Sequence, residues 1–165
     1  MKSNKLAGGG ICAALCLVLL FIGSYLPAKI AFLFASSVVM GICILRYRGL
    51  AAFTTYFAVF LISVFAVPNK LLAWSYASVF GIYPLLKLYI ERINKIVWEY
   101  IVKFFVWNIH LFGMYIILSA FGQNSLFDIG TVWIWLCGIV LMLAYDLVYG
   151  IFINAFYKTY YKYLK

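Results

Sequence analysis

Six long apolar segments, joined by short connections, most constrain what this chain can fold into. They cover approximately residues 6–26, 30–45, 50–67, 71–89, 104–121 and 131–152. A helix needs about 20 mostly apolar residues to cross a bilayer. The segments are continuously apolar rather than alternating, which argues against membrane strands. We therefore expect an all-α, polytopic integral membrane protein with six transmembrane helices in one domain, residues 1–165.

The composition indicates that lipid, rather than water, is the solvent. The chain is 68% hydrophobic and 10% charged, whereas soluble domains are about half apolar and about one quarter charged. A domain of this size cannot hide that much apolar surface in a core, so the lipid bilayer is an expected partner. The net charge of +9 favours contact with anionic lipids. Nucleic-acid binding is not expected, because no basic face remains outside the membrane.

The basic residues predict the orientation of the chain. Eleven of the thirteen Lys and Arg residues lie at the two termini and in the second and fourth connections, while the other connections contain only Lys29 and Lys70. Cytoplasmic segments of membrane proteins collect Lys and Arg. We therefore expect both termini to be cytoplasmic.

Residues 87–103 form the fourth connection, which carries a ladder of alternating charges. This charge ladder consists of Lys87, Glu91, Lys95, Glu99 and Lys103, four residues apart, with Arg92 beside them. Opposite charges four apart on a helix attract each other by about 0.2–0.5 kcal/mol per pair, so we expect a continuous cytoplasmic helix. The ladder either anchors the topology as a solvated stripe or serves as a docking surface for a partner.

Three polar residues within the apolar segments are candidates for a functional role. Asp146 is the only acidic one, and Asn108 and His110 enter the membrane on the fifth segment. Intramembrane charges are costly and usually functional. Asp146 is either a paired structural carboxylate, with His110, Asn108 or Lys87 as partner, or part of a proton or cation relay.

The outer face is the place where a small ligand would bind. Amide and carboxylate groups orient small molecules in otherwise apolar pockets, whereas Trp residues commonly mark the membrane interface. Both explanations remain open for the candidate substrate-binding residues, which are Asn69, Trp74, Gln123, Asn124, Asp128 and Trp133.

Enzymatic chemistry finds little support in the sequence. The single histidine excludes a two-histidine metal site, and no G-x-S-x-G stretch occurs. The glycines at 8–10 lack the following Lys-Ser/Thr of a phosphate-binding loop. We expect no catalytic residues, metal or cofactor, and no ATP site.

Two local patterns predict how helices bend and pack. Pro84, with Gly81 ahead of it, predicts a kink in the fourth segment. In the first segment, "AGGGICAAL", small residues recur four apart and allow another helix to approach closely. The two pairs are Gly9 with Ala13 and Gly10 with Ala14. The approaching helix belongs either to this chain or to another subunit.

The stretch "KLAGGGICAALCLVLLFIGSYLP", residues 5–27, is similar to the first helix of a transporter family. With its size, six expected helices, cytoplasmic termini and lack of an ATP site, the whole chain resembles the substrate-binding (S) components of energy-coupling factor (ECF) transporters of Gram-positive bacteria. The resemblance implies a plasma-membrane protein that captures a vitamin or other small organic solute from outside. It also implies that Gly9, Gly10, Ala13 and Ala14 dock on a transmembrane coupling subunit driven by two ATPase subunits.

Two other functions remain open. One is a non-transporting assembly or scaffold protein of the membrane. The other is a stand-alone proton- or ion-coupled carrier that uses Asp146 and His110. Such carriers often contain repeats with broken helices in matching positions, and only the fourth segment is visibly interrupted.

Overall fold

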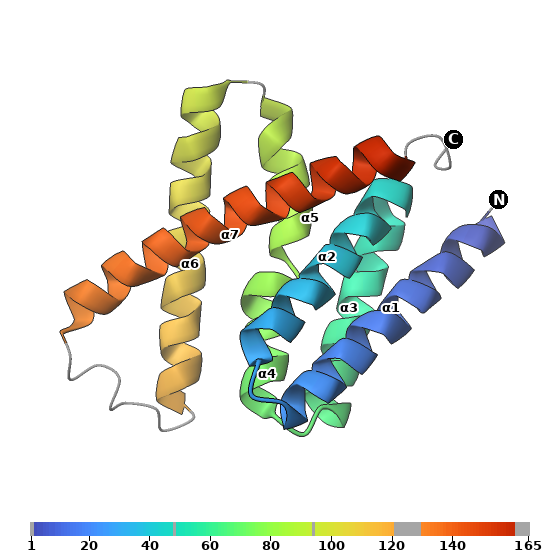
Figure 1. Cartoon of the computed structure of the whole chain (residues 1–165), viewed down its shortest axis with the longest axis horizontal. Helices are drawn as coiled ribbons and strands as arrows, with labels where there is room; N and C mark the ends of the chain where they lie inside the picture. Colours follow the sequence, from blue (N-terminus) through green and yellow to red (C-terminus); the bar gives the residue numbers. More distant parts are fainter. Residues whose placement is uncertain (1, 48, 94, 121–129, 161–165) are drawn as a thin grey trace. The chain divides into compact units, whose positions relative to one another are not determined.

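The computed structural model describes residues 2–47, 49–93, 95–120 and 130–160. All regular elements within these ranges are helices, as predicted (Figure 1). The chain divides into two compact units, Met1–Tyr89 and Ile90–Lys165.

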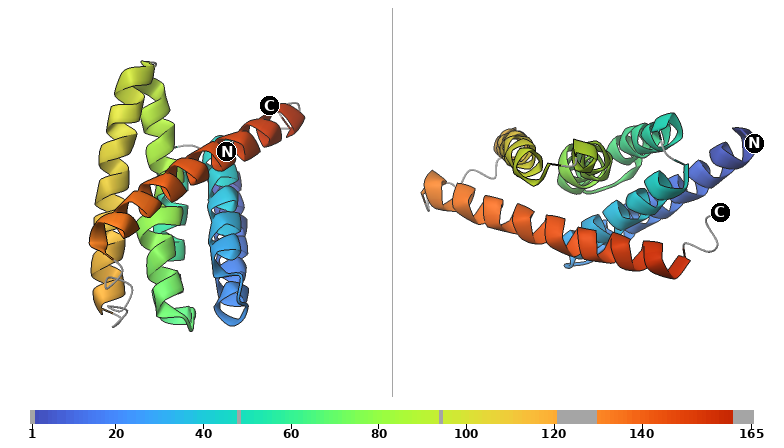
Figure 2. Two further views of the ribbon diagram at one scale, coloured as in Figure 1. Left: turned by 60° about the vertical axis from the view of Figure 1, so that its left-hand side comes forward. Right: turned by 90° about the horizontal axis from the view of Figure 1, so that it is seen from above.

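The first unit is a bundle in which α1 packs along both α2 and α3, and the fourth helical segment packs beside them (Figures 1 and 2). Its elements are α1 (Lys2–Tyr25), α2 (Lys29–Tyr47), α3 (Gly49–Ala66), α4 (Lys70–Ser75), the π-helical turn η1 (Tyr76–Phe80) and α5 (Tyr83–Ile90). The helix boundaries follow the first four apolar segments closely, because each segment ends where polar or proline residues interrupt it.

The fourth segment is not one regular helix, which agrees with the kink predicted at Pro84. Pro84 is the second residue of α5, where a missing N–H group is tolerated. Ahead of it, the Gly81 N–H donates to the Tyr76 carbonyl at 2.7 Å, five residues back, as in a π-helical turn. The backbone therefore widens before the proline.

A polar corner joins α3 to α4. The Asn69 side chain caps α4 by accepting the Leu72 N–H at 3.1 Å. The Lys70 ammonium donates to the carbonyls of Val64, Phe65 and Val67 at 2.8, 3.2 and 3.1 Å. Helix ends leave backbone groups without intrahelical partners, and these two adjacent side chains satisfy some of them.

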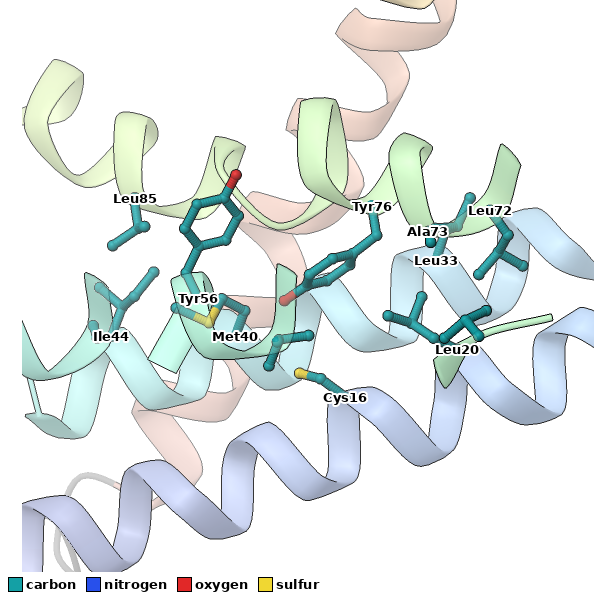
Figure 3. Close-up of a cluster of buried hydrophobic side chains, with 13 residues drawn as sticks. Cys16, Leu20, Leu33, Met40, Ile44, Tyr56, Leu72, Ala73, Tyr76 and Leu85 are labelled. Carbon is teal, nitrogen blue, oxygen red and sulfur yellow. The ribbon is translucent and has the colours of Figure 1, made fainter. Parts of the chain in front are cut away.

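Two of the buried tyrosines in the core of the first unit, Tyr56 and Tyr76, differ in their hydrogen bonding. The Tyr56 hydroxyl donates to the Ala77 carbonyl at 2.7 Å. The Tyr76 hydroxyl points toward Cys16 (Figure 3) but makes no hydrogen bond of ordinary geometry with any residue that the structure describes. The Cys16 thiol donates instead to the Ser36 carbonyl at 3.4 Å. Both rings fill space between the helices, but only one hydroxyl is satisfied.

We expect Tyr56→Phe to lower the free energy of unfolding by about 1 kcal/mol and Tyr76→Phe to leave it unchanged or raise it. The first change removes a buried hydrogen bond and leaves a carbonyl without its partner, whereas the second removes a hydroxyl that had none. Denaturation in mixed detergent micelles, followed by circular dichroism, measures both. Equal losses would mean that the Tyr76 hydroxyl has a stabilising partner.

The second unit consists of the short 3₁₀ turn η2 (Glu91–Ile93) and two long helices, α6 (Ile96–Ala120) and α7 (Thr131–Tyr160). The two long helices are in contact and cross at an angle (Figures 1 and 2). The helix α6 begins well before the apolar segment at 104–121, and α7 continues past residue 152. Charged residues that the sequence placed in connections therefore belong to long helices.

Within the described residues, five helical segments are long and apolar enough to cross a membrane. They are Lys5–Tyr25, Lys29–Tyr47, Lys70–Ile90, Ile96–Ala120 and Trp135–Thr159, and Leu50–Ala66 is a shorter apolar helix. This pattern is that of a multi-pass membrane protein. The sixth span and the cytoplasmic position of both termini remain predictions.

Candidate functional site

A buried ion-pair cluster connects α6 and α7 in the second unit. The Lys103 ammonium donates to Asp146 Oδ2 at 3.0 Å, and the two residues are only 3% and 7% exposed. The same ammonium lies 2.8 Å from Glu99 Oε1 and 4.0 Å from Glu91 Oε1. It also lies 5.7 Å from the centre of the Tyr100 ring. Three of the four acidic residues of the chain thus surround one cation.

The helices bring this cluster together from distant parts of the sequence. Glu99 and Lys103 lie one turn apart on α6, and α7 supplies Asp146. Removing two charges from water costs several kcal/mol per ion, which only close pairing and hydrogen bonding offset. The geometry therefore fits the paired structural carboxylate. The partner shown, Lys103, is not one of the three that the sequence suggested for Asp146.

The prediction of a continuous helix over 87–103 is wrong. The helix α5 ends at Ile90, η2 follows, and α6 begins only at Ile96. In an unbroken helix Glu91 and Lys103 would lie about 18 Å apart along the axis, whereas their charged atoms are 4.0 Å apart. Each pair of opposite charges four residues apart contributes only about 0.2–0.5 kcal/mol. That is too little to keep the helix continuous between Ile90 and Ile96.

The charge ladder is consequently not a uniform exposed stripe. Its two ends, Lys87 and Lys103, are buried, while Glu91 and Lys95 are exposed and Glu99 is half-buried. Arg92 lies within η2. The part of the ladder that can meet a partner is therefore limited to its middle.

The other two intramembrane polar residues on α6 also have partners. The Asn108 amide donates to the Phe104 carbonyl at 2.8 Å and accepts the Trp135 indole N–H at 3.0 Å, which ties α6 to α7. His110 Nδ1 lies 2.6 Å from the Val106 carbonyl oxygen. These contacts hold both side chains in position on α6.

Of the candidate substrate-binding residues, two lie in the first unit, one lies in the second unit and three lie outside the described residues. Asn69 uses its side chain to cap α4, and Trp74 packs edge-on against Phe60 with ring centres 5.9 Å apart. Trp133, in the second unit, is 68% exposed. Gln123, Asn124 and Asp128 lie outside the described residues. Capping α4 occupies the Asn69 oxygen that would orient a ligand, so the structure gives Asn69 a structural role. A substrate-binding site formed by these residues remains a prediction.

The small residues of α1 face in different directions. A Cβ atom at Gly8 would collide with the Tyr47 side chain, and one at Gly9 would lie 2.7 Å from Thr55 Oγ1. Both glycines therefore serve the packing of α1 within this chain. A Cβ at Gly10 would meet nothing within 4 Å, and Ala14 is exposed.

A groove runs along the surface between α1 and α3 in the first unit. This α1–α3 groove has a volume of about 560 Å³ and is lined by Lys5, Leu6, Gly9, Gly10, Ala13, Ala51, Thr54, Thr55 and Ala58. Both threonine hydroxyls donate to the Ala51 carbonyl at 2.9 Å. Farther along the same two helices, a hollow of about 300 Å³ is lined by Leu17, Val18, Phe21, Ile22, Ile62, Ala66 and Val67.

Two features of these sites were not predicted from the sequence. The first is that Lys103 lies inside an apolar helix. Two features of the sequence could have indicated this: Asp146 is a lone carboxylate that needs a cation, and Lys103 lies at the edge of an apolar segment. The second is the groove wall formed by Thr54 and Thr55. Two adjacent hydroxyls in an apolar segment were a signal, but they cannot reveal a groove without the position of α1.

Comparisons of the chain with known proteins give no match. No protein-family model matches it, and neither does any curated protein or solved structure. The functional conclusions therefore depend on the residues and contacts described above.

Proposed function

We propose that this chain is a membrane-embedded S-type subunit of an ECF transporter, located in the plasma membrane of a Gram-positive bacterium. It captures a small organic solute or vitamin from outside. A transmembrane coupling subunit and two ATPase subunits then drive its movement. Both termini face the cytoplasm, and the chain itself carries no catalytic residues.

The observation that carries this proposal is the outward-facing part of the small-residue surface on α1. Gly8 and Gly9 are used inside the chain and Gly10 lines the α1–α3 groove, but Ala14, which does not line that groove, is exposed. Small residues allow helices to approach closely in membranes. A helix of the coupling subunit fits such a surface, and the resemblance of residues 5–27 to the first helix of the family supports this position for the docking face.

Affinity capture tests the proposal. The tagged chain is purified from its native membrane in mild detergent, and co-purifying proteins are identified by mass spectrometry. We expect the wild type to co-purify with a coupling protein and two ATPases. Ala14→Leu should reduce the amount of these proteins captured at least about tenfold, which corresponds to a loss of about 1.4 kcal/mol in binding free energy. The matched control is Ala155→Leu, because Ala155 is an exposed alanine of α7.

Two outcomes contradict the proposal in different ways. Equal capture by Ala14→Leu and Ala155→Leu would show that α1 is not the docking face. Capture of unrelated membrane enzymes, or of none, by the wild type would exclude the S-type role and favour the scaffold.

The carrier alternative has less support from the contacts of Asp146. A relay group exchanges its proton or cation during transport, but Asp146 is held against Lys103 in a buried cluster with Glu99. Reconstituted vesicles with a proton gradient test this alternative. Proton-linked uptake that Asp146→Asn abolishes would establish a carrier.

A further inference from the structure

We propose that the α1–α3 groove holds one acyl chain of an anionic phospholipid, with the lipid phosphate at Lys5. The proposal rests on the membrane location proposed above but not on a role in transport. It concerns a lipid that stays bound at one place, rather than the exchanging lipid around any membrane protein.

The lining of the groove suits a hydrocarbon chain. Among the described lining residues, the polar side chains apart from Lys5 are Thr54 and Thr55, whose hydroxyls already donate to the backbone. No hydrogen-bond donor in the described lining, other than the ammonium, is left for an occupant. The volume of about 560 Å³ falls within the range of about 300–1,000 Å³ typical of small-ligand sites.

The length of the groove matches one leaflet of a bilayer. Lys5 and Ala13 mark its extent on α1, and eight residues of helix rise about 12 Å. One leaflet contributes about 15 Å, half of a hydrocarbon core of about 30 Å. An acyl chain whose headgroup lies at Lys5 therefore runs along the groove without leaving its leaflet.

The next part of the α1–α3 seam argues against a rigid helix as the occupant. Beyond Ala13 the small lining residues give way to large ones, including Leu17, Val18 and Phe21. A transmembrane helix seated in the groove would have to pass over these side chains in the other leaflet. A flexible chain confined to one leaflet does not meet them.

The charge of the first unit selects an anionic lipid. Residues 1–89 contain seven Lys and Arg residues and no Asp or Glu. Lys5 and Arg46 are both exposed, and the contact of Gly8 with Tyr47 places them at the same end of the bundle. Clustered basic residues at a membrane surface attract anionic headgroups.

Native mass spectrometry of the full-length protein tests the site. The protein, purified in mild detergent, is titrated with palmitoyl-oleoyl phosphatidylglycerol or with the matching phosphatidylcholine, and retained lipids are counted. We expect the wild type to retain phosphatidylglycerol about fivefold better, the preference that one basic residue provides. Lys5→Gln should bring the two lipids close to parity.

A groove-filling variant separates this site from general lipid contact. Gly10→Leu places a side chain in the groove where no heavy atom lies within 4 Å of the new Cβ, and we expect it to reduce retention of both lipids severalfold. Its matched control is Gly113→Leu on α6, where the space is equally open. Ala58→Leu fills the groove from α3 and replaces Gly10→Leu if circular dichroism shows that variant to be unfolded.

Three outcomes would overturn the proposal. The first is equal retention by the groove-filled protein and Gly113→Leu. The second is a wild type that does not prefer phosphatidylglycerol. The third is a groove-filled protein that keeps its lipid but loses a co-purifying membrane protein, which would identify a partner helix as the occupant. Because Ala14 does not line the groove, failure of the Ala14→Leu capture test leaves this proposal standing.

Discussion

Lys103→Met is expected to lower the free energy of unfolding by about 3–5 kcal/mol, the cost of breaking a buried ion pair by removing one partner. Lys103 is 3% exposed, and its ammonium contacts Asp146 and Glu99 at 3.0 and 2.8 Å. Its removal leaves the buried Asp146 carboxylate without this cation. Methionine fills a similar volume, so the loss is mainly electrostatic rather than a packing defect.

Three further variants show which interactions account for this loss of stability. Asp146→Leu should cost less, because Glu99 still pairs with Lys103. The double variant Lys103→Met, Asp146→Leu should be more stable than Lys103→Met alone, since it also removes the buried carboxylate that lost this cation. Glu91→Gln should cost less than about 1 kcal/mol, because the Glu91 side chain is 49% exposed and 4.0 Å away, and exposed pairs contribute little.

Unfolding by sodium dodecyl sulfate in mixed micelles, followed by circular dichroism, measures this series. A Lys103→Met protein within about 1 kcal/mol of the wild type would show that the cluster is solvated in micelles. A double variant whose loss equals the sum of the two single losses would show that the two residues are not coupled.

The apolar segments predict the helical, membrane-type fold well because hydrophobic length is a local property. They fail at α6, where the sequence predicted the boundary at 104 and the helix begins at Ile96. A hydropathy pattern counts Glu99 and Lys103 as two separate charges, which disfavour a span. In the structure they neutralise each other at 2.8 Å, so both are accommodated in the helix.

The candidate sites were harder to predict because they depend on contacts between distant residues. Asp146 stands out in the sequence, but its partner lies 43 residues away, and only the crossing of α6 and α7 identifies it. The four-residue spacing of Gly9, Gly10, Ala13 and Ala14 predicts a packing face but not its direction. The structure separates Gly9, which faces Thr55, from Gly10, which faces open space.

Gly23→Ala is expected to lower the free energy of unfolding by about 1–3 kcal/mol, the typical cost of overpacking a tight contact. A Cβ atom at Gly23 would lie 2.7 Å from the Phe32 Cβ and 3.1 Å from its Cγ. The Phe32 Cβ is fixed by the backbone of α2, so no side-chain rotation removes the clash. The α1 and α2 helices must therefore move apart where they approach near their connection.

Gly10→Ala, on the same helix, separates this clash from the general effect of replacing a glycine. Alanine stabilises a helix by about 0.5–1 kcal/mol relative to glycine, and a Cβ at Gly10 meets nothing within 4 Å. We therefore expect Gly10→Ala to be neutral or stabilising in the same detergent titration. If both variants gain stability, α1 and α2 do not need close backbone contact at Gly23. A loss confined to Gly23→Ala would instead establish that contact as a condition for packing the first unit, since the two changes share one helix and one chemistry and differ only in what the added methyl group meets.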